Sequence, residues 1–273
     1  MTWRSRLPTF QFSIAQLLGL VTLVAAMLGT WYFCTRAERA ATHIRSLGGD
    51  VEWVIDGSLV NTDMRPLPPE ERYSRVVIGS EWSGGRRGLR LLNSIRQMRH
   101  LEISASTEIA TLLDVNLDSL TKLRAIKIEG LSVPAQCVSQ LARMTVLGDV
   151  KFVDCELDGE VVAVTSELPV LHELGLNGSR IKGHIRPAKG SSLHRIDLSQ
   201  ASLPDDELDW LASLKDARTI LLSDTCVTNR SLLQLSALPR LQTISVVRTA
   251  VTKSGMDEFL RTAIRSDCFL YNG

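Results

Sequence analysis

Two consecutive stretches of equal length decide the fold of this chain. Residues 217–240 read ARTILLSDTCVTNRSLLQLSALPR, and residues 241–264 read LQTISVVRTAVTKSGMDEFLRTAI. Both stretches carry aliphatic residues at their fourth and sixth positions, threonine at the ninth and twelfth, and valine at the eleventh. A fixed internal period of this length is typical of repeat proteins, in which each unit supplies one supersecondary element. The sequence therefore has to be interpreted repeat by repeat.

The same frame extends upstream through most of the chain. In each unit, a starting residue is followed by aliphatic residues three and five positions later, by a small residue eight positions later in most units, and by another aliphatic residue two positions after that. From Leu123 onward the spacings are 24, 24, 22, 24 and 24 residues, and two weaker units precede it at offsets of 25. The eight units start at Tyr73, Met98, Leu123, Leu147, Leu171, Leu193, Ala217 and Leu241.

Each unit predicts one short strand followed by a turn or helix. An aliphatic triplet at i, i+3 and i+6 closes most units, as Leu232, Leu235 and Leu238 do. Because no unit can bury its apolar face alone, neighbouring units must stack into a continuous core. We expect an α/β solenoid with parallel strands on the concave face and helices or turns on the convex face. The unit at 171–192 is short and carries Gly183, Pro187 and Gly190, so its convex side should be irregular chain.

This pattern resembles the leucine-rich-repeat family over about seven-tenths of the chain. The segments Thr225–Thr228 and Thr249–Thr252 are similar to the T-x-V-T repeats of bacterial membrane-anchored proteins in this family. Many of these proteins also start their membrane anchor with a motif like Phe12-Ser13-Ile14. The resemblance implies a module that binds or scaffolds proteins.

The amino-terminal region carries twenty consecutive residues without a charge, at 14–33. At about 1.5 Å per residue, a helix of this length covers the roughly 30 Å hydrocarbon core of a bilayer. A cleaved signal peptide is the alternative, but its apolar core would be shorter and would end in small residues, whereas this run ends in Trp31, Tyr32 and Phe33. The flanking arginines are nearly balanced, and the short basic tail favours a single-pass protein whose carboxyl-terminal domain lies outside the cytoplasm.

The chain divides into five predicted segments. Residues 1–11 form a short basic tail, and residues 12–34 form the transmembrane helix. Residues 35–72 supply a juxtamembrane helix, a capping strand and an irregular connection, and residues 73–264 hold the repeats. Residues 265–273 supply a closing strand, whose inward positions should be Cys268 and Leu270 because the repeat frame continues onto them.

No catalytic, cofactor-binding or metal-binding constellation is predicted. The five cysteines and five histidines are dispersed, with no C-x-x-C motif and no second histidine in the H-E-x-x-H arrangement. The formal net charge of +1 gives no indication of nucleic acid as a partner. We therefore expect a non-enzymatic protein with an unidentified protein partner. The alternative is a regulatory subunit or a cryptic enzyme, with its site in the irregular 56–72 region or in the short repeat at 171–192.

The concave sheet is the predicted partner-binding face, because a rigid array presents many side chains with little ordering cost. A merely solvated sheet face remains an equal alternative, since the frame places no aromatic cluster among the positions it assigns to this face. The candidate residues are His100, Glu102, Lys127, Glu129, Asp149, Lys151, Glu173, Asn177, Arg195 and Asp197.

Overall fold

The structure is a computed structural model of the 273-residue chain. It describes residues 14–55, 72–95, 97–188, 190–263 and 268–271. The predicted basic tail at 1–11 and almost all of the irregular connection at 56–72 lie outside the described residues.

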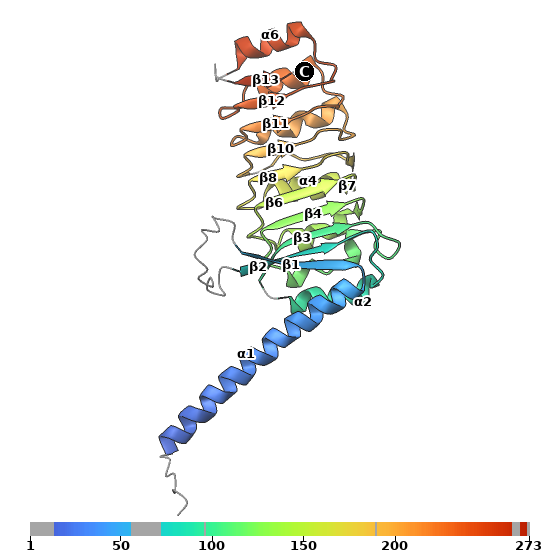
Figure 1. The fold of residues 1–273 in the computed structure, drawn as a ribbon. Helices are drawn as coiled ribbons and strands as arrows, with labels where there is room; N and C mark the ends of the chain where they lie inside the picture. Colours follow the sequence, from blue (N-terminus) through green and yellow to red (C-terminus); the bar gives the residue numbers. More distant parts are fainter. Residues whose placement is uncertain (1–13, 56–71, 96, 189, 264–267, 272–273) are drawn as a thin grey trace, which may run out of the picture.

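A ten-stranded sheet runs the length of the molecule, one rung per repeat (Figure 1). Every neighbouring pair from β2 onward is parallel, as the repeat frame predicts, and only β1 and β2 are antiparallel. In order along the sheet, the strands are β1 (Gly49–Ile55), β2 (Arg72–Ile78), β3 (Met98–Ser104), β4 (Ala125–Glu129), β6 (Asp149–Val153), β8 (Glu173–Gly175), β10 (Arg195–Asp197), β11 (Thr219–Leu221), β12 (Thr243–Ser245) and β13 (Phe269–Tyr271).

A second parallel sheet was not predicted from the sequence. It joins β5 (Ser132–Val133), β7 (Glu156–Asp158) and β9 (Arg180–Lys182). Its buried residues, Val133 and Leu157 among them, are the aliphatic residues ten positions after each repeat start. Because these segments occupy the same position in successive repeats, their extended backbones lie side by side and can pair with one another.

Most repeats return along the other side of the sheet as short helices, which lie behind the strands in Figure 1. The predicted apolar triplets of these segments are buried. Between β9 and β10 the described residues contain no helix, which confirms the prediction for the short repeat. The helical segments after the amino-terminal helix are α2 (Gly85–Leu89), η2 (Arg90–Ser94), η3 (Leu112–Asp114), η4 (Leu117–Ser119), η5 (Ala135–Cys137), α3 (Val138–Leu141), α4 (Gly159–Ser166), η6 (Asp205–Ser213), α5 (Asn229–Leu235) and α6 (Lys253–Thr262).

The turn that leaves each strand explains the small residue in the repeat frame. The hydroxyl of Thr225 donates to the carbonyl oxygen of Leu222 at 2.6 Å, and that of Thr249 donates to the carbonyl of Val246 at 2.7 Å. In six successive repeats, the residue seven positions after the repeat start has a positive φ, a feature that was not predicted from the sequence. These residues are Gly130, Asp154, Gly178, Gln200, Asp224 and Arg248. Side chains larger than glycine adopt this left-handed backbone at a cost, which the surrounding turn must offset.

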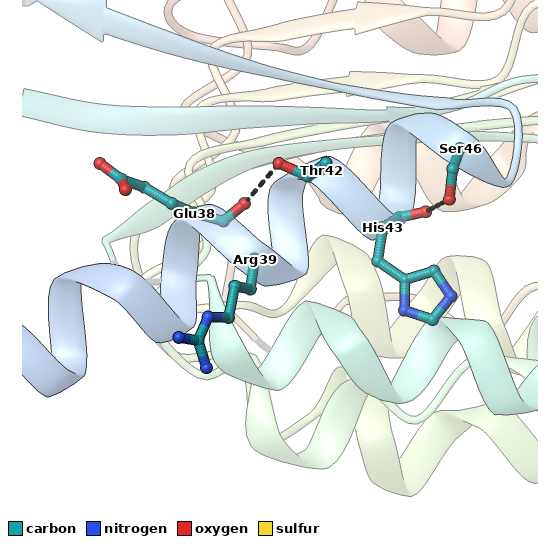
Figure 2. Close-up of a pocket in the computed structure, with 5 residues that line it drawn as sticks. All are labelled: Glu38, Arg39, Thr42, His43 and Ser46. Carbon is teal, nitrogen blue, oxygen red and sulfur yellow. Dashed lines mark hydrogen bonds between the residues drawn. The ribbon is translucent and has the colours of Figure 1, made fainter.

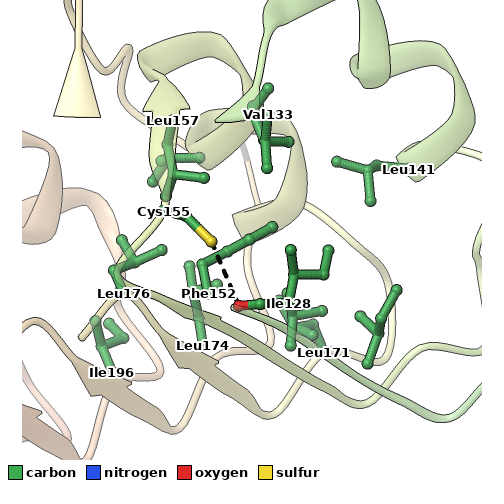
Figure 3. Packing of buried hydrophobic residues seen from close by; sticks show 14 of the residues in the cluster. Ile128, Val133, Leu141, Phe152, Cys155, Leu157, Leu171, Leu174, Leu176 and Ile196 are labelled. Atoms are coloured by element: carbon green, nitrogen blue, oxygen red, sulfur yellow. Dashed lines mark hydrogen bonds between the residues drawn. The ribbon is translucent and has the colours of Figure 1, made fainter. Parts of the chain in front are cut away.

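One continuous core connects all repeats. Figure 3 shows how the inward residues of successive strands, such as Phe152, Leu174 and Ile196, pack against one another. Each of these side chains is fully buried. The Cys155 thiol donates to the carbonyl oxygen of Ile128 in the neighbouring repeat at 3.4 Å. Stacking therefore buries what a single repeat would leave exposed.

The amino-terminal end of the core is covered by α1 (Ile14–Ser46). The part of this helix from residue 35 onward corresponds to the predicted juxtamembrane helix. Its residues Ala37, Ala41 and Ile44 lie on one face and are buried. Trp82 is also buried here, and a Cβ at Gly84 would lie 2.5 Å from its ring, so the loop needs glycine at this close approach.

The helix α1 also runs without a break across the predicted boundary between residues 34 and 35. Neither proline nor glycine interrupts the sequence there, so the apolar run and the residues that cover the core, such as Ala41 and Ile44, belong to a single helix. Among the described residues, no helix combines the length and apolar character needed to cross a membrane.

The carboxyl-terminal cap is the predicted closing strand. The strand β13 pairs in parallel with β12, and Ile244 lies opposite Leu270. Cys268 is buried and Leu270 is partly buried, as the repeat frame predicts. Phe269 and Tyr271 point to the opposite face and are 65% and 56% exposed.

Candidate binding surface

The face of the ten-stranded sheet turned away from the convex helices is called the concave face here. Because side chains alternate along a strand, the residues flanking each buried position project from this face. One column contains Asp149, Glu173 and Arg195, and the next contains Glu102, Lys127 and Lys151. The structure thus places nine of the ten candidate residues in β3, β4, β6, β8 and β10, and Asn177 lies just past β8.

Neighbouring strands pair the charges of the concave face. Lys151 Nζ lies 3.3 Å from Glu173 Oε1 and 3.7 Å from Asp149 Oδ2, and Arg195 Nε lies 3.4 Å from the same Glu173 oxygen. Within β4, Lys127 Nζ lies 2.9 Å from Glu129 Oε2. These pairs are partly exposed, so each contributes little to stability, but together they hold the charged groups in a fixed pattern.

Arg75 was not among the predicted residues, and it extends this network toward the amino terminus. Its guanidinium lies 2.6 Å from Glu102 Oε1 and 3.4 Å from Glu52 Oε2, so it joins β1, β2 and β3. The hydrogen bond to Glu102 raises the pKa of Arg75. Its place in the frame, two residues after Tyr73, is the signal that could have identified it.

Partial burial changes the ionisation of groups on this face. Desolvation raises the pKa of Asp149, although Lys151 opposes the shift. One carboxylate oxygen of Asp149, Oδ1, is buried without a hydrogen-bond partner. Desolvation also lowers the pKa of His100, and the charge of Arg75 lowers it further. The central strands therefore carry groups that would gain from donors on a bound partner.

The carboxyl-terminal part of the concave face is neutral. Ser223 and Ser245 form a hydrogen bond at 3.0 Å, and Thr219 and Leu221 project from β11. The exposed rings of Phe269 and Tyr271 lie at the end of this surface, in register with Thr243 and Ser245. The sequence placed no aromatic cluster among the concave positions because these positions did not extend to β13, where the structure adds Phe269 and Tyr271.

A crevice of about 530 Å³ lies beside α1 (Figure 2). Its lining residues, Glu38, Arg39, Thr42, His43 and Ser46, all come from this one helix. The hydroxyls of Thr42 and Ser46 donate to backbone carbonyls within α1, at 2.9 and 2.8 Å. Because no second element contributes a lining side chain, the crevice is the polar surface of a helix.

The short repeat contains ion pairs between repeats. Arg186 contacts Glu167 at 2.5 Å and Glu160 at 3.2 Å, and His184 Nδ1 lies 2.8 Å from Glu207 Oε2. These contacts fasten the irregular segment to its neighbours. Within the described ranges, no group of three or more metal-ligating side chains comes together.

Four cysteines, Cys137, Cys155, Cys226 and Cys268, are free thiols. Cys137 and Cys155 are buried, and desolvation raises the pKa of each to about 11. A buried thiol with a raised pKa is a poor nucleophile, so these two side chains have a structural role.

The repeat register, the parallel sheet and the convex helices define this chain as a leucine-rich-repeat solenoid. No family model and no curated protein matches it. Among solved structures, it is similar to internalin C2 from Listeria monocytogenes, with 18% identity, a TM-score of 0.45, and coverage of 67% of this chain and 74% of that chain.

Two other solved structures are also similar. A protein from Bacteroides fragilis has 12% identity and a TM-score of 0.38, with coverage of 64% of this chain and 65% of that chain. The leucine-rich-repeat ectodomain of a membrane receptor kinase from Arabidopsis thaliana has 17% identity and a TM-score of 0.37, with coverage of 67% of this chain and 28% of that chain.

Proposed function

We propose that this protein binds a protein partner through its concave face. The observation that carries the proposal is the fixed array of ion-paired side chains on β2 to β10, which continues into a neutral surface with two exposed aromatic rings. Strands set these side chains in place before binding, so little conformational entropy is lost when a partner docks. Exposed aromatic side chains supply the apolar contact that charged columns lack.

Binding rather than catalysis is the role that these groups support best. Titratable contacts such as those of Arg186 with Glu167 and Lys151 with Glu173 are ion pairs that join neighbouring repeats. A nucleophile activated by a base would need different partners. The alternative role is that of a regulatory subunit or cryptic enzyme with its site in the irregular 56–72 region or in the short repeat at 171–192. That role would require a convergent pocket of titratable groups in one of these regions.

The proposal predicts that neutralising three concave cations weakens partner binding. In K127Q/K151Q/R195Q, each replaced side chain loses an ion pair on the concave face. The matched control R143Q/R180Q/K182Q also removes three ion-paired cations, all of them outside the ten-stranded sheet. We expect proteins captured by the full chain in mild detergent to fall about tenfold for the concave variant. Equal capture by both variants would contradict this assignment of the site.

We further propose that α1 anchors the chain in a membrane. The helix projects away from the solenoid (Figure 1). Exposed apolar side chains occur at 18, 20, 21, 23, 24, 27, 28, 31 and 32, positions that cover more than half of the helix circumference. The remaining arc holds small, uncharged residues such as Gly19, Thr22, Ala26 and Gly29, so this stretch carries no charged face, and lipid is a solvent that suits it. These positions belong to the twenty-residue uncharged run at 14–33, some of whose side chains lie outside the described part of the structure.

The membrane proposal predicts an orientation. A reporter that is active only outside the cytoplasm should be active when fused after Gly273, because a short basic tail tends to stay in the cytoplasm while the following domain is exported. The same reporter placed before Met1 is the control and should be inactive. An inactive fusion after Gly273 together with an active fusion before Met1 would show the reverse orientation.

A further inference from the structure

A column of basic residues follows one rim of the concave face. These residues lie just before the first concave position of successive strands, and backbone hydrogen bonds fix their register. The Arg124 amide donates to the Arg99 carbonyl at 2.8 Å, the His194 amide to the His172 carbonyl at 2.9 Å, and the Arg218 amide to the His194 carbonyl at 2.8 Å. We call Arg99, Arg124, His172, His194 and Arg218 the basic rim.

The side chains of the basic rim are close and accessible. The rings of His172 and His194 stack with their centroids 5.4 Å apart and their planes 9° from parallel. Arg124, His172 and Arg218 are exposed. Gly148 occupies the column between Arg124 and His172, and Gln242 ends it, so no acidic residue interrupts the column.

The electrostatics of His194 indicate that the rim is electropositive. Desolvation lowers the pKa of His194 most, and the charges of Arg218 and His172 lower it further. Arg240 acts in the same direction, and Asp216 acts against them. Asp216 is itself paired with Arg240 at 2.7 Å, so it only partly compensates the positive rim.

We propose that the basic rim binds an acidic, extended peptide segment that lies across the strands. The inference rests on the proposed function, because the segment would belong to the protein bound on the adjacent concave face. From Arg124 to Arg218 there are four strand-to-strand steps, or about 19 Å, which corresponds to about six residues of extended chain. Guanidinium groups at both ends can hold carboxylates in bidentate hydrogen bonds.

The neighbouring column favours a peptide over a nucleic acid. Asp149 and Glu173 flank the rim on the concave face and would repel a uniformly charged phosphate backbone. A peptide can place acidic residues on the rim and neutral or basic residues above Asp149 and Glu173. The net charge of +1 likewise provides no general attraction for a polyanion.

The test uses the full chain in a nonionic detergent and a fluorescent peptide of about ten residues in which glutamate alternates with serine, long enough to span the rim. Fluorescence anisotropy should show saturable binding that weakens as salt is added. The variant R124Q/R218Q should bind the peptide about tenfold more weakly. The control R143Q/R230Q removes the same charge from convex helical segments and should bind as the unchanged protein does.

Absence of saturable binding, or equal losses in the two variants, would overturn the inference. A single-stranded oligothymidylate that binds more tightly, with the same sensitivity to R124Q/R218Q, would overturn the choice of a peptide. K127Q/K151Q/R195Q keeps the rim intact and separates the two proposals. If that variant loses partner capture while the unchanged chain does not bind the peptide, the proposed function is supported and the basic rim is ruled out. If that variant keeps partner capture while the unchanged chain binds the peptide, the basic rim is supported and the proposed function is ruled out.

Discussion

Replacing Ile220 with aspartate is expected to unfold the repeat domain. The Ile220 side chain is fully buried in β11, in register with Ile196 on one side and Ile244 on the other. A carboxylate placed there would lose its hydration and meet only aliphatic groups. We expect a loss of about 5 kcal/mol or more in the free energy of unfolding, which is comparable to the whole stability of many domains. Leu174→Asp in β8 should behave in the same way.

The neighbouring position provides the control for this substitution. Thr219→Asp introduces the same side chain one residue away, where the strand faces the concave surface and Arg195 lies opposite. Thermal unfolding followed by circular dichroism should show a cooperative transition near that of the unchanged chain for Thr219→Asp and none for Ile220→Asp. An unchanged melting temperature for Ile220→Asp would show that the inward and outward positions have been exchanged.

Removal of residues 265–273 should lower stability and cause self-association. In β13, the Phe269 amide donates to the Gln242 carbonyl at 2.7 Å, and the Tyr271 carbonyl accepts from the Val246 amide at 2.9 Å. Without these bonds, β12 becomes an open edge of the parallel sheet, and the core near Phe259 loses its cover. We expect a fall of about 5 °C or more in melting temperature.

Light scattering of the shortened chain measures the self-association. The double variant F269S/Y271S is the control, because it keeps the strand backbone and removes only the two exposed rings. It should remain monodisperse, whereas the shortened chain should form larger species. Scattering and melting identical to those of the full chain would show that the repeat structure ends at α6.

The repeat period explains why so much of the fold could be predicted. One frame fixes where each strand lies, which of its residues face inward, and that its neighbours are parallel, so the closing strand at Phe269–Tyr271 followed from counting alone. The short repeat was predicted as irregular because glycine and proline replace its helix. The part of each repeat beyond the strand is less constrained, and the pairing of β5, β7 and β9 therefore went unpredicted.

Contacts between distant segments could not be derived from the period. The antiparallel pairing of β1 with β2 places Glu52 beside Arg75, and the sequence between these strands carries no hairpin signal. Trp82 is buried at the end of the core that the carboxyl-terminal part of α1 covers. Neither contact repeats, so neither has a counterpart elsewhere in the chain.

The candidate site was predicted as a set of positions, but its pairing pattern was not. Which lysine meets which carboxylate depends on lateral register, and the 25-residue and 22-residue spacings hide that register in the sequence. The bonding of Lys151 to both Asp149 and Glu173 required the structure. The basic rim was missed because its residues lie at or just before the start of each strand, at a position where the repeat frame specifies no residue type.

The central claim is that the concave face contacts a protein partner, and site-specific photocrosslinking tests it most directly. A photoreactive amino acid would replace Lys127 or Arg195 on the concave face, and Arg143 or Lys182 away from it, in the full chain in the cells that produce it. We expect a discrete crosslinked protein from both concave positions and none from Arg143 or Lys182. Crosslinks from Arg143 and Lys182 alone, or equally from all four positions, would contradict the claim.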